Sequence, residues 1–308
     1  KKIAERERAP FYVVGETTGD DRFVFEQADG VKPIDLGMKD MFGSSPKTVM
    51  TDSTKHHKYK AVKTNAAKLN EYIETVLQIE GVACKDWLTN KVDRSVTGKI
   101  ARQQCQGEIQ LPLSDCGVVA LDYTGNSGIA TSIGHAPQAG LIDPAAGSVL
   151  SITEALTNIV GANLNGGLKA VSLSANWMWP CRNKGEDAGL YRAVKACSDF
   201  ACSLGINIPT GKDSLSMTQK YGNKKVIAPG TVIISAGGEV CDVKKTVSPV
   251  LQQKKSRLYY IDFSGCDMQL GGSALAQSMG LLGDKAPGVK SADYFANAFN
   301  AVQALVEN

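Results

Sequence analysis

The chain has 308 residues, of which 43% are hydrophobic and 21% charged, so it contains enough apolar material for one large domain or two ordinary ones. A net charge of only +3 and an aromatic content of 6% argue against a nucleic-acid-binding surface. No apolar run reaches the ~18 residues that a membrane span needs, so we expect neither nucleic acid nor membrane as a partner.

The first 45 residues are too few to form an independent core. Residues 11–14 and 22–26 flank a turn-rich stretch and predict a hairpin. Residues 33–42 predict a short strand and a helical turn. The composition of residues 43–63, rich in Ser, Thr, Lys and His, is typical of a linker.

The next part of the chain alternates helix and strand signals. Residues 66–80 have apolar side chains at helical spacing and stop at Gly81, and a second short helix is expected around Trp87. Residues 108–121 predict one long strand. Residues 123–144 are rich in Gly, Ser and Pro and predict a long loop, which in a compact domain is usually functional.

A regular pattern follows through the middle of the chain. Residues 151–161 predict a helix that opens with a Ser-Ile-Thr-Glu capping box. Residues 168–174 predict a strand, 187–204 an amphipathic helix, and 206–208 a short strand. Residues 226–240 predict one or two further strands.

The last part begins with a polar linker at residues 242–256. Residues 257–263 predict a strand, and the Gly-Gly-Ser at 271–273 opens a helix that runs to about residue 282. A final helix is expected to begin near Ser291 and to continue to the end of the chain. The overall pattern of helix and strand signals predicts an α+β fold.

The cysteines and histidines limit the chemistry. Eight cysteines are scattered without a C-x-x-C pair, which favours buried, reduced thiols in a cytoplasmic protein over zinc ligands or disulfides. Only three histidines are present, and the His56-His57 pair lies in the polar linker, so a His-rich metal site is excluded. Trp177 and Trp179, after a predicted strand, indicate a buried anchor rather than a cofactor-binding motif.

Three oxygen-bearing side chains carry the strongest chemical signal. Glu154 and Asn158 are four residues apart, so a helix projects them from one face. Asp115 interrupts an otherwise apolar predicted strand, where a carboxylate is costly unless it is paired or bound to a metal. Carboxylate and amide oxygens are ligands that Mg²⁺ prefers. The pattern therefore predicts a metal-nucleotide site.

Other interpretations of these acids remain open. Glu154 stands at the third position of the predicted capping box, where it would bond the backbone amide of Ser151. Asp122 and Asp143 are competing acids, each of which is also explained as a loop or turn residue.

Residues 211–214, Gly-Lys-Asp-Ser, resemble a phosphate-contact loop, in which Lys212 supplies a cation and Ser214 a hydroxyl. They are not a Walker motif, because the G-x-x-x-x-G-K-[ST] frame is absent. An ordinary surface turn is the alternative. Arg94 and Arg102 are either phosphate contacts or exposed charges.

Several motifs occur together in order along the chain. As a set they resemble the large single-chain phosphoribosylformylglycinamidine synthases. The motifs are DRSVTG (93–98), ARQQ (101–104), LPLSDC (111–116), TSIG (131–134), LIDPAA (141–146), EALTN (154–158), LSANWM (173–178), GEDAGLY (185–191) and GKDSLSM (211–217).

The resemblance implies a ligase that uses ATP and glutamine-derived ammonia to convert formylglycinamide ribonucleotide to the amidine. It implies two copies of a module related to aminoimidazole ribonucleotide synthetase. On this basis residues 1–63 are the end of a preceding domain plus a linker. Residues 64–245 resemble the N-terminal domain of that synthetase, as a second copy, which implies a sheet with helices packed on one face and partial α/β domains on either side. Residues 246–308 are a linker and the start of a C-terminal-like domain.

Carried over by motif, Ser114 matches a nucleotide contact, and Asp115, Glu154 and Asn158 match magnesium ligands; the implied cofactors are ATP or ADP and Mg²⁺. His135 stands where the family commonly has Glu, and Thr153 where it often has Gly, so the resemblance gives His135 no role. The catalytic residues are not identified.

The resemblance further implies that this chain is a fragment whose partners are the first synthetase module and the glutaminase domain of the same polypeptide. Alternatively, the set is a structural ADP and magnesium site in a scaffold module, or the chain is a relative of aminoimidazole ribonucleotide synthetase. In the family, paired first domains cover one sheet face. We therefore expect the isolated chain to be inactive as a synthase and to form homodimers by light scattering, which a strictly monomeric mass at high concentration would contradict.

Overall fold

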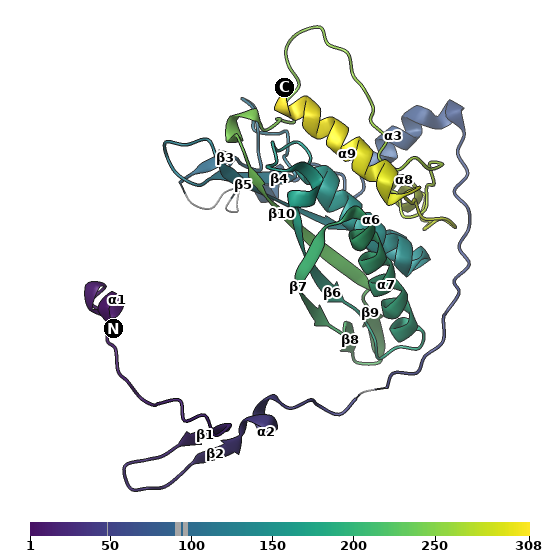
Figure 1. Ribbon diagram of the computed structural model, residues 1–308. Coiled ribbons are helices and arrows are strands. Elements are labelled where there is room, and N and C mark those ends of the chain that lie inside the picture. The colour runs from purple at the N-terminus through teal and green to yellow at the C-terminus, as the bar shows by residue number, and fades with distance from the viewer. Residues whose placement is uncertain (48, 90–93, 95–97) are drawn as a thin grey trace. The chain divides into compact units, whose positions relative to one another are not determined.

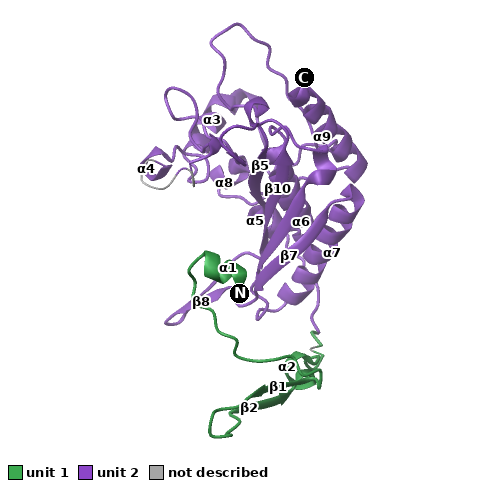
Figure 2. Ribbon diagram, turned by 60° about the vertical axis from the view of Figure 1, so that its left-hand side comes forward, with its two compact units in different colours: residues 1–50 green, residues 51–308 purple. Residues whose placement is uncertain are grey.

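The computed structural model describes residues 1–47, 49–89, 94 and 98–308. Two compact units, residues 1–50 and 51–308, are distinguished by their internal contacts (Figure 2). No helix in the described ranges is long and apolar enough to cross a membrane. The domain boundaries expected at 63/64 and 245/246 stay predictions.

The first unit is small and has no buried residue in its described part. It contains α1 (Lys2–Arg6), the antiparallel pair β1 (Arg22–Phe25) and β2 (Ile34–Gly37), and α2 (Met38–Phe42). The predicted strand and helical turn within residues 33–42 are confirmed. The predicted hairpin partner was wrong: residues 22–25 pair with 34–37, and residues 11–14 are not a strand.

The second unit is built on a sheet with the strand order β3-β4-β5-β10-β6-β7 (Figure 1). Its neighbours pair antiparallel except β6 and β7, which are parallel. The hairpin of β8 and β9 is a separate two-stranded sheet. The strands are β3 (Ile100–Arg102), β4 (Cys116–Ala120), β5 (Gly128–His135), β6 (Ser172–Met178), β7 (Asn207–Ser214), β8 (Thr218–Tyr221), β9 (Lys224–Ile227) and β10 (Thr231–Val240).

Helices α6, α7 and α9 lie on one face of this sheet (Figure 1), so the predicted α+β fold with a one-sided helical layer is confirmed. The opposite face exposes Ile129 and Ile133 of β5. Homodimer formation through that face stays a prediction. The helices of this unit are η1 (Ala66–Lys68), α3 (Leu69–Leu77), α4 (Asp86–Thr89), α5 (Pro137–Ile142), α6 (Pro144–Ile159), η2 (Gly167–Ala170), α7 (Glu186–Leu204), η3 (Val243–Lys245), α8 (Ala274–Ser278) and α9 (Ala292–Glu307).

The core lies between the sheet and the helical layer. Helix α6 contributes a row of fully buried apolar side chains that includes Ile152, Leu156 and Ile159. Phe295 and Phe299 of α9 are also fully buried in this core. Removing such side chains from water stabilises the fold by about 1.5–3 kcal/mol each.

Strand β5 was missed by the sequence analysis, which predicted a loop over residues 123–144. Its burial alternates strictly, with the small residues Gly128, Ala130, Ser132 and Gly134 on the covered face. Small side chains are needed there because α6 lies close to the strand. A Cβ added at Gly134 would be 2.3 Å from both the Ala155 nitrogen and the Ser151 oxygen.

Two other predicted strands were wrong. The long strand expected over residues 108–121 is confined to β4, because Gly107, Gln110 and Pro112 form a turn before it. Residues 257–263 form no strand. The eight cysteines are free, as expected, but Cys84, Cys202 and Cys241 are exposed rather than buried.

The segment that leads into the second unit is attached to the start of α7. Helix α7 begins after Gly185, which has no side chain to cap it. Asp52 supplies the missing acceptor: its carboxylate accepts hydrogen bonds from the backbone nitrogens of Gly185 (3.0 Å) and Asp187 (3.2 Å). Hydrogen bonds from the backbone N–H groups of Ser53 and Gly185 lower the pKa of Asp52.

Because the pKa of Asp52 is lowered in the folded protein, its contribution is present above the ordinary value of 3.8 and is lost as the pH falls through the folded value. We expect Asp52→Ala to accelerate tryptic cleavage after Lys55 severalfold at neutral pH, as measured by mass spectrometry. Asp29→Ala, which removes only a bond to Val31 in the β1–β2 turn, is the control. Equal cleavage rates in the two variants would contradict this role of Asp52.

Candidate functional site

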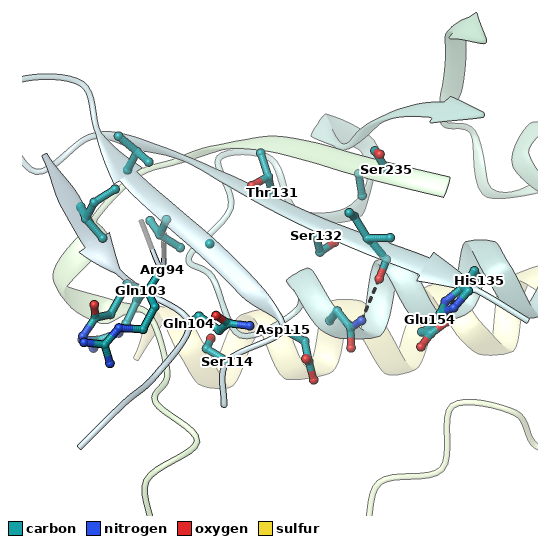
Figure 3. Close-up of a pocket in the computed structure, with 18 residues that line it drawn as sticks. Arg94, Gln103, Gln104, Ser114, Asp115, Thr131, Ser132, His135, Glu154 and Ser235 are labelled. Carbon is teal, nitrogen blue, oxygen red and sulfur yellow. Dashed lines mark hydrogen bonds and ion pairs between the residues drawn. The ribbon is translucent and has the colours of Figure 1, made fainter. Parts of the chain in front are cut away.

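Four of the six residues predicted from the sequence line one cavity of about 900 Å³. Ser114 and Asp115 come from the turn before β4, and Glu154 and Asn158 from α6. Figure 3 shows Asp115 and Glu154 reaching the cavity from these two different elements. The structure therefore brings together side chains that are about 40 positions apart in the chain.

The turn before β4 is held by Ser114. Its backbone nitrogen donates to the oxygen of Gln104 (2.8 Å), and its hydroxyl donates to the oxygen of Cys116 (3.0 Å). Asp115 follows it and is exposed, and within the described part of the chain its carboxylate has no hydrogen bond or ion pair. Asp115 thus has both carboxylate oxygens available to a ligand.

Glu154 and Asn158 are each held in place by the neighbouring strand β5. Asn158 Nδ2 donates to the oxygen of Ile133 (2.9 Å), which leaves its Oδ1 as the atom available to a cation. Glu154 Oε2 accepts a hydrogen bond from the backbone nitrogen of His135 (2.6 Å), and the His135 Nδ1 lies 3.8 Å from the same oxygen. No described residue contacts Glu154 Oε1 in this way, so it too is available.

The capping interpretation of Glu154 was wrong. Helix α6 begins seven residues earlier than predicted, with Asp143 as its N-cap and Pro144 in its first turn. Ser151 is buried within the helix, where its hydroxyl donates to the oxygen of Gly147 (2.9 Å). Glu154 therefore does not cap the helix. Asp143 does, because its side chain accepts a hydrogen bond from the Ala145 nitrogen.

Two arginines also line the cavity. Arg94 Nη1 donates to Gln110 Oε1 (3.1 Å), and Arg102 donates to the oxygen of Thr246 through Nε (3.2 Å) and Nη2 (2.7 Å). Within the described ranges neither forms an ion pair with Asp115 or Glu154. Both positive charges are therefore available to phosphate oxygens, which Arg binds well.

The available oxygens suit a hard cation. The described residues include no group of three or more His, Cys, Asp or Glu side chains placed to hold a metal ion. The set here has two carboxylates and one amide. Mg²⁺ commonly keeps several waters and is bound through one or two carboxylates together with substrate phosphates, which this set and the arginines match.

Lys212 and Ser214 do not line this cavity. The sequence predicted a loop at residues 211–214, but these residues continue β7, where Lys212 pairs with Asn176 and Ser214 with Met178. Strand β7 is the edge strand opposite to β3. The parallel pairing with β6 extends the strand beyond its apolar start. A nucleotide contact by either residue stays a prediction.

Polar residues on the central strands also line the cavity, and no motif in the sequence predicted them. Thr131 and Ser132 come from β5 and Ser235 from β10. Ser132 is buried and donates from its hydroxyl to the oxygen of Ala155 (2.6 Å), so it joins the strand to α6. The alternation of small and larger residues over 128–135 was the available signal for this strand.

Three solved structures from Thermotoga maritima resemble parts of this chain. PurL complexed with ATP is 15% identical, with a TM-score of 0.46, over 74% of this chain and 32% of that chain. PurLQS is 16% identical, with a TM-score of 0.49, over 74% and 33%. PurL complexed with FGAR is 15% identical, with a TM-score of 0.45, over 75% and 32%. The chain thus spans about a third of the length of these relatives, none of which is close enough to transfer a ligand.

The fold and cavity define an α+β domain in which carboxylate and amide oxygens and two arginines line one cavity. The model of the FGAR-AT PurM_N-like domain matches residues 84–239, just over half of the chain. This range contains every residue that lines the cavity. The chain belongs to the FGAR-AT PurM_N-like domain family.

Proposed function

We propose that this chain is part of an ATP- and glutamine-dependent ligase that converts formylglycinamide ribonucleotide to formylglycinamidine ribonucleotide in purine biosynthesis. The large cavity is then its Mg²⁺-nucleotide site. The observation that carries the proposal is that Ser114, Asp115, Glu154 and Asn158 line one cavity within the matched family domain. The enzyme acts in the cytoplasm, for which the free cysteines are suitable.

In this proposal Asp115, Glu154 and Asn158 hold Mg²⁺ through their available oxygens. Ser114 contacts the nucleotide, and Arg94 and Arg102 neutralise phosphate charge. When bound, Mg²⁺ supplies positive charge to the phosphate oxygens. Lys212 and Ser214, which lie on β7 outside this cavity, stay proposed nucleotide contacts.

The other parts of the reaction belong to the rest of the polypeptide. The first synthetase module and the glutaminase domain are the proposed partners, and 1–63, 64–245 and 246–308 are the proposed domain limits. In the described ranges the cavity wall contains a single histidine, His135, and no cysteine. We accordingly expect no synthase activity from these 308 residues alone.

A structural role for the same nucleotide site is the second candidate. Its support is that strand β5 fixes both side chains. The backbone nitrogen of His135 donates to Glu154, and the backbone oxygen of Ile133 accepts from Asn158. Such a fixed donor set suits a permanently bound ADP and Mg²⁺ in a scaffold module. Catalysis would then take place elsewhere in the enzyme.

The test is to purify the protein without added nucleotide, denature it, and identify any released nucleotide by chromatography. Stoichiometric ADP, lost together with stability in the Asp115→Asn/Glu154→Gln variant, would support the structural role. No co-purified nucleotide, together with Mg²⁺-dependent ATP binding that the variant lacks, would support the working ATP site. Absence of nucleotide binding under all conditions would contradict both.

A further inference from the structure

His135 is a residue of the large cavity to which neither the family match nor the proposed function gives a role. It is the last residue of β5, and it is the single histidine among the described residues that line the cavity. Figure 3 shows its side chain beside that of Glu154. The same side chain also borders a neighbouring cavity of about 820 Å³, so it is open to ligands.

The imidazole ring and the Glu154 carboxylate face each other because the fold fixes both. The backbone nitrogen of His135 donates to Glu154 Oε2 (2.6 Å), and the His135 Nδ1 lies 3.8 Å from the same oxygen. Strand and helix are joined nearby by the hydrogen bond from Ser132 to Ala155. The position of the nitrogen relative to the carboxylate therefore does not depend on a loop.

The separation of Nδ1 and Oε2 suits a metal ion better than a hydrogen bond. A direct N–H···O bond needs about 2.7–3.2 Å. Typical bonds of a transition-metal dication to an imidazole nitrogen and a carboxylate oxygen are each about 2.1 Å long. Two such donors on one ion lie about 3.0 Å apart at right angles and about 4.2 Å apart when opposite. The observed 3.8 Å lies within this range.

Both groups are available to an ion. The side chains of His135 and Glu154 are 57% and 45% exposed. Within the described part of the chain the imidazole has no hydrogen bond, and no Lys or Arg pairs with Glu154. Glu154 Oε2 keeps a second lone pair besides the one that accepts from the backbone, and Oε1 is unoccupied by any described residue.

The donor types distinguish between cations. Asn158 adds an amide oxygen from the same face of α6, since its Nδ2 is held by Ile133. The set then has one nitrogen and several oxygens. Mg²⁺ takes oxygen ligands, whereas imidazole is a ligand of divalent transition metals. An imidazole at this position therefore favours a transition metal over Mg²⁺.

We propose that His135 is a metal ligand and that, with Glu154 and Asn158, it makes this a site for a divalent transition-metal ion such as Mn²⁺. The inference rests on the proposed function for the presence of a metal-nucleotide site and adds the identity of its cation. A plain ion pair between a protonated His135 and Glu154 is the competing explanation, and the test separates the two.

Mn²⁺ with ADP is the probe, because Mn²⁺ accepts oxygen ligands as well as imidazole and is not selected by the thiolates of the eight free cysteines. Free Mn²⁺ is followed by electron paramagnetic resonance as the 308-residue chain is titrated. Pulsed measurements on the bound ion detect its coupling to directly ligated nitrogen. Labelling the histidines with ¹⁵N separates imidazole from the nitrogens of ADP, and we expect the coupling to change with the label.

His135→Gln is expected to remove the imidazole coupling and to weaken Mn²⁺ binding about tenfold or more, as changes at metal sites commonly do. Mg²⁺, measured by competition, should change less than about threefold, because it is bound through oxygens. The control is His56→Gln/His57→Gln, which removes the other two histidines of the chain, both outside the large cavity. It should keep the coupling and the affinity.

Mn²⁺ that binds without imidazole coupling would overturn the role of His135 and leave the proposed function intact. Equal loss of Mn²⁺ and Mg²⁺ affinity in His135→Gln would do the same. If the folded chain bound neither cation in the presence of ADP, this inference and the proposed nucleotide site would both be wrong.

Discussion

Asp115→Asn and Glu154→Gln are each expected to weaken Mg²⁺-dependent ADP binding by about 100-fold or more. Even groups that only support metal ligands cost about 10–100-fold when they are mutated, and these two are proposed as direct ligands. Both changes preserve the shape of the side chain, and the amide introduced by Glu154→Gln would keep an oxygen for the backbone N–H of His135. The loss is therefore expected in the charge available to the ion rather than in the fold.

Isothermal titration with ADP in the presence of Mg²⁺, and again with a chelator, measures the effect. Asp122→Asn is the matched control: Asp122 lies just beyond the end of β4, outside the cavity, where its carboxylate accepts hydrogen bonds from Thr124. It should bind ADP as the unmodified protein does. If Asp122→Asn and Asp115→Asn had the same effect, Asp115 would have no special role.

Gly134→Ala is expected to destabilise the chain by about 3 kcal/mol or more. Adding atoms to a well-packed core costs about 1–3 kcal/mol, and occasionally more. Here the new Cβ would meet two backbone atoms of α6 at 2.3 Å, and backbone cannot rotate away as a flexible side chain can. Helix α6 must move from β5, which would also displace Glu154 and Asn158.

Denaturant unfolding, followed by circular dichroism, gives this change in the free energy of unfolding. Gly237→Ala on the neighbouring strand β10 is the control, because its Cβ would lie 4.0 Å from the Ala130 oxygen, the nearest atom that it would meet. We expect it to stay within about 1 kcal/mol of the unmodified chain. Equal stability of the two variants would mean that α6 does not lie on Gly134 as described.

Long amphipathic helices were predictable because their signals are local. Helix α7 was predicted within one residue at its start, and Gly205 ends it with a φ of +69°. Helix α9 begins after Ser291, whose side chain accepts from the Tyr294 nitrogen as an N-cap. The buried side of α7 includes Ala193 and Cys197, whereas the apolar Val194 is exposed.

Strand β5 was not predictable by the same means. Its covered residues are small and its composition is that of a loop, so its identity depends on how closely α6 approaches. The start of α6 was misplaced for a related reason: residues 151–154 imitate a capping box, and the true cap, Asp143, lies in the predicted loop. Local patterns do not carry information about such distant packing.

The same distinction applies to the candidate site. Glu154 and Asn158 were predicted to share one helix face because they are one turn apart. This prediction does not depend on where the helix begins, since the spacing of the two residues stays the same. Asp115 was predicted because a carboxylate within an apolar stretch is costly unless it is paired or bound to a metal. In the structure it lies just before β4 rather than inside a strand. Lys212 and Ser214 were assigned from a short pattern whose backbone shape is set by pairing with β6.

Gln303 on α9 joins two parts of the chain that are far apart in sequence. This buried side chain donates from Nε2 to the oxygens of Val160 (2.6 Å) and Ala162 (2.9 Å), and its Oε1 accepts from the Leu164 nitrogen (3.0 Å). These groups follow directly after α6 and lie about 140 positions upstream. During synthesis on the ribosome, these backbone groups cannot bond to Gln303 until about 140 further residues have been added. Such a long delay before closure is expected to make nascent chains of this domain dependent on chaperones.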